Sequence, residues 1–274
     1  MRPRRIRAEG EGKDRDFVVA LARGLDILRA FRGGEGEALG NGDLAQRTGL
    51  SRSTVSRLTH TLHKLEYLSH DPRTARYRLA PPVLSLGFSC LAGMALRDLA
   101  RPQMQALAED CGMPVALAGR DRLSMVYLAR CRGSNAVTLA IEVGAHIKLA
   151  SSALGRAYIA ALDEPARLAL LDRLRAHEGA DWPELRRGIE AAIEQHATHG
   201  YCLSLAEWKP EVHAVAVPYL PADGSPLVAF NCGGPAQLLP RERIEAEIAP
   251  RLLALVRQLP AHPRQQTAGP RHAA

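Results

Sequence analysis

The spacing of apolar residues divides the chain into two parts. In the first part they recur every three or four positions, as in residues 17–31, where Val18, Leu21, Leu25 and Leu28 suit one face of a helix. From about residue 113, short apolar runs typical of strands alternate with amphipathic helical patterns. Because 274 residues suffice for two separate cores, the pattern predicts a two-domain protein of the α+β class.

Two short helical patterns occupy the centre of the first part, over residues 43–49 and 52–68. A glycine-rich stretch before them, residues 32–42, predicts a flexible connector. After them, "YLSHDPRTARYRLA" predicts a small hairpin with its turn at Asp71-Pro72. The helical pattern then returns over residues 83–112, and its expected interruptions are Gly87, Gly93 and Pro102.

The second part predicts a largely antiparallel sheet with helices packed on it. Strands are expected at residues 114–119, 124–130, 136–143, 201–207, 213–220 and 227–234. Helices are expected at residues 153–162, 164–177, 183–200 and 241–259. Pro250 lies inside the last of these helices, so a kink or a break is expected there.

Positive charge is concentrated in the first part. Residues 1–80 contain 16 Lys and Arg residues against 10 Asp and Glu residues, whereas residues 81–274 contain 20 against 19. This distribution indicates a polyanion as the partner of the first part and a near-neutral partner, or none, for the second.

Composition narrows the cellular setting. The N-terminal residues are charged without a following apolar stretch, and no run approaches the length of a membrane span, so we expect a cytoplasmic protein without a membrane partner. The five cysteines are scattered, with no Cys-x-x-Cys pair, which favours free thiols in a reducing compartment. No cofactor is expected.

Residues 43–62 meet the requirements of a helix-turn-helix. Ala45 is small enough for a second helix to cross closely, and Gly49 suits a turn that needs a positive φ. Leu50 is placed to lie beneath the turn, and the inner face of the second helix carries apolar residues at helical spacing: Val55, Leu58 and Leu62. An ordinary helical hairpin is the alternative, but it does not require all of these features together.

The outer face of the second helix predicts contact with double-stranded DNA. Its residues are polar or basic: Ser51, Arg52, Ser53, Thr54, Ser56, Arg57 and His60. Ser51 is placed to cap the helix, and the other side chains suit phosphate oxygens and base edges in the major groove. Arg73, Arg76 and Arg78 in the hairpin would flank the groove as a wing. A pseudo-palindromic operator is expected, because one recognition helix spans few base pairs.

The sequence leaves three alternatives to effector-controlled DNA binding. A hydrolase is disfavoured, because no Gly-x-Ser-x-Gly elbow accompanies Ser151-Ser152. A metal sensor would use His196 and His199, yet both precede Gly200, where the end of a helix already favours histidine. A DNA-binding protein without an effector is the third alternative. A ligand-dependent change in DNA affinity would exclude it.

At this point the chain resembles the IclR family of bacterial transcriptional regulators. "RGLDILRAF", "LAQRTGLSRSTVSRLTHTL" and "YRLAPPVLSLG" match its winged helix-turn-helix. "SSALGRAYIAAL" is similar to the opening of its effector domain, and "HAVAVPYLPADGSPLVAFNCGGP" to the closing strands. The expected organisation is a disordered tail (1–15), a winged helix-turn-helix (16–80), a linker helix (81–97), a GAF-like effector-binding domain (98–262) and a second disordered tail (263–274).

The resemblance also implies partners and an effector pocket. Members act as homodimers or homotetramers, and the residues expected between subunits are Leu84, Leu86, Leu91 and Leu96. The expected effector is a small organic or aromatic carboxylic acid. The residues implied for its pocket are Ile147, Leu149, Ala153, Leu154, Gly155, Glu207, Trp208, His213, Asn231 and Gly233. The amides of "ALG" could bind an anion and Trp208 could cover an apolar body, although Trp208 suits a core position equally well.

Overall fold

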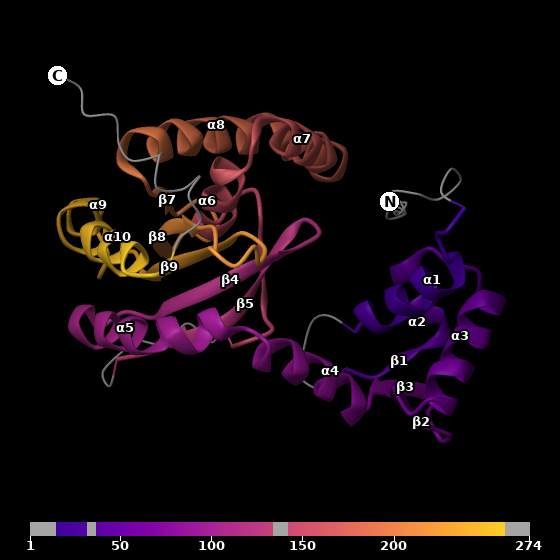
Figure 1. Cartoon of the computed structure of the whole chain (residues 1–274). Helices are drawn as coiled ribbons and strands as arrows, with labels where there is room; N and C mark the ends of the chain where they lie inside the picture. Colours follow the sequence, from indigo (N-terminus) through magenta and orange to yellow (C-terminus); the bar gives the residue numbers. More distant parts are fainter. Residues whose placement is uncertain (1–14, 32–36, 134–141, 261–274) are drawn as a thin grey trace. The chain divides into compact units, whose positions relative to one another are not determined.

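The computed structural model describes residues 15–31, 37–133 and 142–260. The chain divides into two compact units, Met1–Gly93 and Met94–Ala274 (Figure 1). The tails predicted at residues 1–15 and 263–274 lie outside the described residues, except for residue 15. Most of the strand predicted at residues 136–143 also lies outside them.

The first unit is a winged helix-turn-helix. Its helices are α1 (Val19–Arg29), α2 (Asn41–Thr48), α3 (Arg52–Lys64) and α4 (Pro81–Ala92). Its antiparallel sheet has the order β1-β3-β2, with strands β1 (Leu39–Gly40), β2 (Leu68–Asp71) and β3 (Arg76–Leu79). Ile27, Leu44, Val55 and Leu68 are buried in its core together with Leu39. Strand β1 lies in the segment that was predicted to be a flexible connector. The segment is ordered there because Leu39 is buried in the core and β1 pairs with β3.

The linker helix differs from its predicted extent. Helix α4 ends at Ala92 and is capped by Gly93, and a new helix, α5 (Ala95–Cys111), starts two residues after that glycine, so Leu96 belongs to α5. Gly87 and Pro102 do not interrupt their helices. A mid-helix glycine costs only about 1 kcal/mol. Pro102 loses one backbone hydrogen bond, and the buried residues on either side of it in α5 hold that helix in place.

The second unit is built on a six-stranded sheet of order β6-β5-β4-β9-β8-β7, in which all neighbours are antiparallel. Its strands are β4 (Val115–Asp121), β5 (Ser124–Cys131), β6 (His146–Lys148), β7 (Cys202–Leu205), β8 (Val212–Tyr219) and β9 (Val228–Pro235). Strand β6 was not predicted. It is only three residues long, so its pattern carries little signal.

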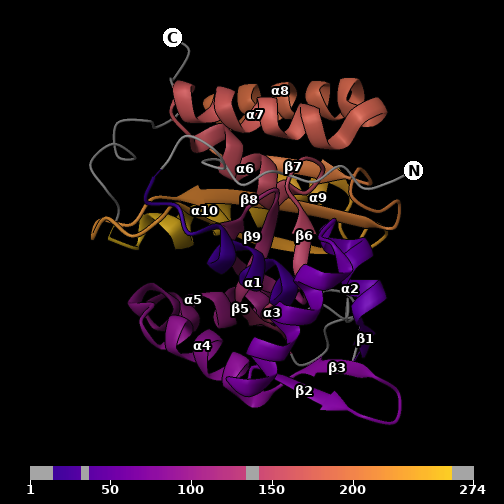
Figure 2. The same cartoon turned by 90° about the vertical axis from the view of Figure 1, so that its right-hand side faces the viewer.

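Helices cover both faces of this sheet. Helices α5 and α10 (Ala249–Arg257) pack on one face, and α6 (Ala153–Ala161) packs on the other (Figures 1 and 2). Helices α7 (Glu164–Glu178) and α8 (Trp182–His199) lie against α6. Since side chains alternate along a strand, each strand contributes one set of residues to α5 and α10 and the other set to α6.

The kink or break predicted at Pro250 is found as an irregular turn, and the backbone stays helical through it. Helix α9 (Arg241–Arg243) passes into a π-helical turn, Ile244–Ile248, and α10 follows. Pro250 is the second residue of α10, and in the first turn of a helix the missing N–H of a proline costs few backbone hydrogen bonds.

No single helix in the described ranges is long and apolar enough to cross a membrane. The consecutive helices α4 and α5 reach the required length and composition only when they are taken together across Gly93–Met94.

Candidate DNA interface and effector pocket

The turn between α2 and α3 sets the geometry of the helix-turn-helix. Gly49 ends α2 with a φ of 69°, and its N–H donates to the Ala45 carbonyl at 2.9 Å. A residue with a side chain would be strained at this φ. Ser51 then caps α3, because its Oγ accepts the Thr54 N–H at 3.3 Å. The structure therefore contains the turn and the cap that were predicted.

The polar face of α3 points to solvent. The predicted contact residues that are exposed are Ser51, Arg52, Ser53, Ser56, Arg57 and His60, whereas Thr54 is half-buried. Ser51 Oγ lies 2.9 Å from Thr54 Oγ1, so these two hydroxyls partly satisfy each other. On the inner face, Thr59 is fully buried, and its hydroxyl donates to Asn41 Oδ1 at 3.1 Å. Thr59 thereby links α3 to α2 from the inner face, and the outer face of α3 stays accessible to DNA.

The wing arginines have different surroundings. Arg73 has 92% of its side chain exposed, and Arg78 is exposed as well. Arg76 is used within the unit: its Nη1 donates to the Ala38 carbonyl at 2.6 Å and lies 3.4 Å from Asp43 Oδ2. The Arg76 guanidinium therefore fastens the wing to α2, while Arg73 and Arg78 remain the candidates for a phosphate contact.

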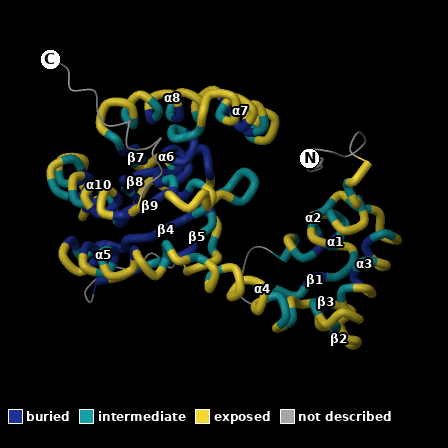
Figure 3. The backbone as a smooth tube through the Cα atoms, in the orientation of Figure 1, coloured by how far each residue is buried: buried dark blue, intermediate teal, exposed yellow. Residues whose placement is uncertain are grey.

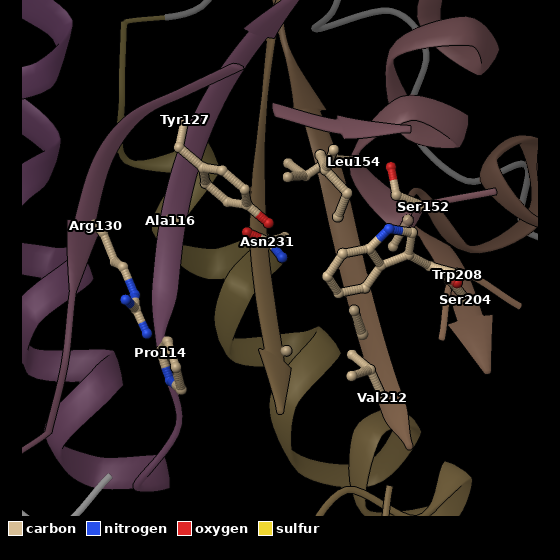
Figure 4. Close-up of a pocket in the computed structure, with 14 residues that line it drawn as sticks. Pro114, Ala116, Tyr127, Arg130, Ser152, Leu154, Ser204, Trp208, Val212 and Asn231 are labelled. Atoms are coloured by element: carbon tan, nitrogen blue, oxygen red, sulfur yellow. The ribbon is translucent and has the colours of Figure 1, made fainter. Parts of the chain in front are cut away.

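A pocket lies between α6 and the sheet (Figure 4). It encloses about 530 Å³ of empty space, its opening to solvent included. Its lining residues are Pro114, Ala116, Tyr127, Arg130, Ile147, Ser152, Ala153, Leu154, Ser204, Trp208, Val212, Ala214, Asn231 and Gly233. Small residues on the strands, such as Ala116, Ala214 and Gly233, leave the space that larger side chains would fill.

Six residues of the predicted effector site line this pocket: Ile147, Ala153, Leu154, Trp208, Asn231 and Gly233. Two of the other four, Leu149 and Gly155, are packing residues. Leu149 is fully buried, and a Cβ added to Gly155 would lie 1.9 Å from the Leu149 carbonyl oxygen. The Gly155 N–H, which was expected to hold an anion, instead donates to Ser152 Oγ at 3.1 Å. Ser152 thereby caps α6.

The remaining two, Glu207 and His213, do not line the pocket. His213 alternates with the pocket residues Val212 and Ala214 along β8, so it faces the opposite side, and its Nδ1 lies 2.8 Å from the Leu239 carbonyl. Glu207 Oε2 lies 2.5 Å from Nη1 of the buried Arg156.

This ion pair holds the loop that carries Trp208. Arg156 also donates to the Ala150 carbonyl at 3.3 Å and to the Leu203 carbonyl at 3.5 Å. On α8, Gly188 makes room for the guanidinium, because a Cβ there would lie 2.2 Å from Arg156 Nη2. Glu207 therefore supports the pocket wall without touching the cavity.

Sequence reasoning missed Tyr127 and Arg130, which lie three positions apart on β5 and would face opposite sides of a regular strand. The pairing of β5 with β4 shifts: Ala118 is opposite Tyr127, whereas Leu117 is opposite Ala129. Leu128 is thus the extra residue of a β-bulge, and the bulge turns Arg130 to the same face as Tyr127. The available signal was an arginine in an otherwise apolar strand.

Arg130 brings a positive charge into the pocket. Its side chain is 5% exposed, and Nη1 lies 3.6 Å from Oε1 of the exposed Glu142. Burial lowers the pKa of the Arg130 guanidinium, and the neighbouring Arg132 lowers it further. An arginine nevertheless stays charged at neutral pH. Burial also raises the pKa of Tyr127 to about 12, so its hydroxyl is neutral and able to donate.

Asn231 gives the pocket a second polar group. It is 8% exposed, and its Oδ1 is buried without a hydrogen-bond partner among the described residues. A buried polar atom left without a partner costs about 1–3 kcal/mol. In the sheet order, Asn231 on β9 lies between Arg130 on β5 and the β7–β8 loop that carries Trp208 (Figure 4). The pocket is therefore charged at one side, polar in the middle and aromatic at the other side.

The two histidines considered for a metal end α8. Burial lowers the pKa of His196, and the ring of His199 lies 5.6 Å from the ring of Tyr201. Across residues 15–31, 37–133 and 142–260, no three or more His, Cys, Asp or Glu side chains are grouped so as to hold a metal ion.

Comparison with known proteins identifies the family. The IclR helix-turn-helix domain matches residues 20–72, and the C-terminal domain of bacterial transcriptional regulator IclR matches residues 88–261. The chain is 36% identical over 264 residues to the HTH-type transcriptional regulator TsaQ1/TsaQ2 of Comamonas testosteroni, which covers 96% of this chain and 93% of that protein. It is 30% identical over 251 residues to the Pca regulon regulatory protein of Pseudomonas putida, and this alignment covers 90% of this chain and 84% of that protein.

Among solved structures, the crystal structure of an IclR family transcriptional regulator from Brucella abortus has a TM-score of 0.84 at 44% identity. The alignment covers 90% of this chain and 93% of that one. The two domain matches together span most of the chain, in the order of the two units described above. The chain belongs to the IclR family of bacterial transcriptional regulators.

Proposed function

We propose that this protein is a transcriptional regulator whose affinity for operator DNA is controlled by a small carboxylic acid bound in the second unit. The observation that carries this proposal is the buried Arg130 guanidinium in an otherwise largely apolar pocket. Arg130 is already paired with Glu142, and a ligand carboxylate on the pocket side of the guanidinium would add charge-assisted hydrogen bonds. A carboxylate matches the planar fork of a guanidinium.

The rest of the pocket favours an acid with a flat apolar body. The carboxylate would lie at Arg130, the body would reach past Asn231, and the Trp208 indole would cover it. Asn231 Oδ1 accepts hydrogen bonds, so it favours a ligand that carries a donor such as a hydroxyl group. An aromatic monocarboxylate with a ring hydroxyl meets these demands. The Pseudomonas putida relative is a Pca regulon regulatory protein, which agrees with a role in transcriptional control.

The function is tested by measuring DNA affinity with and without an acid. A duplex selected from a random library by the protein would serve as the operator, with benzoate and hydroxybenzoates as probes. A coupling of about 1–3 kcal/mol predicts a 5- to 150-fold change in operator affinity. Benzamide, which has the same shape without the charge, is the matched control. The proposal fails if a panel of aromatic and short aliphatic monocarboxylates neither binds nor alters DNA affinity.

Arg57→Ala is expected to weaken operator binding by about 1–3 kcal/mol, because Arg57 is exposed on the outer face of α3. If Arg57 contacts a guanine, the preference at one base position should also relax. Loss that is equal on all sequences would assign it to a phosphate instead. A gel-shift titration at fixed salt measures both quantities, and unchanged affinity would exclude Arg57 from the interface.

The protein is further proposed to act in the cytoplasm as a homodimer or homotetramer on a pseudo-palindromic site. Helix α4 has no buried residue, and Leu84, Leu86 and Phe88 are 63%, 57% and 60% exposed (Figure 3). A second copy of the chain would cover this apolar surface. A monomer in light scattering at micromolar concentration would contradict this assembly.

A further inference from the structure

Two of the five cysteines are in contact in the second unit. Cys111 ends α5, and Cys232 lies on β9, 121 positions later in the chain. Their sulfur atoms are 3.8 Å apart. Cys232 alternates with Asn231 and Gly233, so it points away from the effector pocket and toward α5. The packing of α5 on the sheet thus brings together two thiols whose spacing in the sequence gave no indication of a pair.

We propose that Cys111 and Cys232 are a site of oxidative modification, a dithiol that a small hydroperoxide converts into a disulfide between α5 and β9. Bringing the sulfurs into bonding distance requires a movement of less than about 2 Å, since a disulfide bond is about 2.05 Å long. Cys111 is 3% exposed and Cys232 is fully buried. The oxidant must therefore be as small as hydrogen peroxide, and a bulky disulfide such as oxidised glutathione would not reach either sulfur.

The surroundings make Cys111 the attacking thiol. A hydrogen bond from the Cys232 thiol lowers the pKa of Cys111, and the positive charges of Arg243 and Arg251 lower it further. Arg243 is fixed nearby, because its Nη2 donates to the Cys111 carbonyl at 2.9 Å. The pKa of Cys232 is raised, so it keeps the proton. Thiolates are the form that reacts with peroxides.

The other cysteines provide an internal contrast. Burial raises the pKa of Cys131 and raises that of Cys202 to about 12, so both stay protonated. Cys90 is exposed and lies in the other unit.

The reaction balances in two steps. The Cys111 thiolate attacks one oxygen of hydrogen peroxide, the O–O bond breaks, and hydroxide leaves and takes up a proton as water, which leaves a sulfenic acid on Cys111. Cys232 sulfur then attacks Cys111 sulfur, the S–O bond breaks, and the hydroxyl leaves as water with the Cys232 proton. Two thiols are oxidised by two electrons, and one peroxide is reduced to two waters. The disulfide links α5 to the strand that carries Asn231 and Gly233.

The experiment uses the full-length Cys90→Ser protein, which removes the exposed thiol. After treatment with hydrogen peroxide, mass spectrometry should show the loss of two hydrogen atoms and a peptide joining Cys111 to Cys232, with Cys131 and Cys202 still free. The same dose of oxidised glutathione should leave all four thiols. The disulfide closes a long loop, so the melting temperature of the second unit should rise by several degrees and return on reduction.

Two results would overturn the proposal. The first is a peroxide-treated protein in which Cys111 is oxidised to sulfinic acid without a link to Cys232. The second is loss of Cys131 or Cys202 at the same rate as Cys111. Cys232→Ser is the matched variant: it should accumulate the sulfenic acid on Cys111, which a dimedone probe traps, and it should form no disulfide. Because these measurements involve neither DNA nor an effector, their outcome is independent of the proposed function.

Discussion

Replacing Arg130 with glutamine is expected to weaken the binding of an acidic effector by about 30-fold to several-thousand-fold, which corresponds to about 2–5 kcal/mol. The Arg130 side chain is buried in the pocket wall, so a carboxylate beside it would be shielded from solvent. Glutamine keeps most of the volume and some hydrogen-bonding capacity but removes the charge. Isothermal titration calorimetry with the aromatic acid that binds most tightly to the native protein measures the loss.

Arg132→Gln is the matched control for this experiment. Arg132 lies two positions further along the chain and also forms an ion pair with Glu142, but it does not line the pocket. Its replacement should leave effector affinity within about twofold, since exposed ion pairs contribute little. If Arg130→Gln and Arg132→Gln bind the acid equally well, the carboxylate is held elsewhere. The Arg130→Gln protein should also bind benzoate and benzamide with similar affinity, because it lacks the guanidinium that would favour a charged carboxylate over a neutral amide.

Gly155→Ala is expected to destabilise the second unit by about 3 kcal/mol or more. A Cβ at this position would overlap the backbone of Leu149, and a backbone atom cannot turn aside as the end of a side chain can. Helix α6 would have to move away from the sheet and open the buried core beneath it. Both tryptophans, Trp182 and Trp208, lie in the second unit, so their fluorescence during urea unfolding reports its stability.

Gly24→Ala is the matched substitution in the other unit. Gly24 is also a helical glycine, but a Cβ there meets no atom within 4 Å. It should leave the tryptophan transition unchanged and stabilise helix α1 by up to about 1 kcal/mol. Equal urea midpoints for Gly155→Ala and the native protein would show that the close approach of α6 to Leu149 is not required.

The local elements of this protein were readable from the sequence, because each depends on residues close together in the chain. Gly49 provides the positive φ of the turn, Ser51 caps α3, and the apolar residues of α3 recur at the helical period. The π-helical turn before Pro250 agrees with the missing amide of proline. These signals predicted the helix-turn-helix, its polar outer face and most strands and helices of the second unit.

The effector pocket was only partly readable. The sequence resemblance placed Trp208 and Asn231 at the cavity, and the alternation of side chains along β8 explains why His213 is turned away from it. Glu207 is instead the ion-pair partner of Arg156, because the side chain of Arg156 extends from α6 to the β7–β8 loop. The two residues of this ion pair are 51 positions apart, and no pattern within either segment predicts their contact.

The charge in the pocket and the cysteine pair were decided by tertiary structure alone. Arg130 faces the cavity because one bulge residue, Leu128, reverses the alternation of β5, and a bulge depends on how two strands pair. Cys111 meets Cys232 because α5 packs on the face of the sheet opposite α6. The sequence determined which segments are helices and strands, since those preferences are local. Which side chains share a cavity depends on strand register and helix packing, which arise from contacts between distant segments.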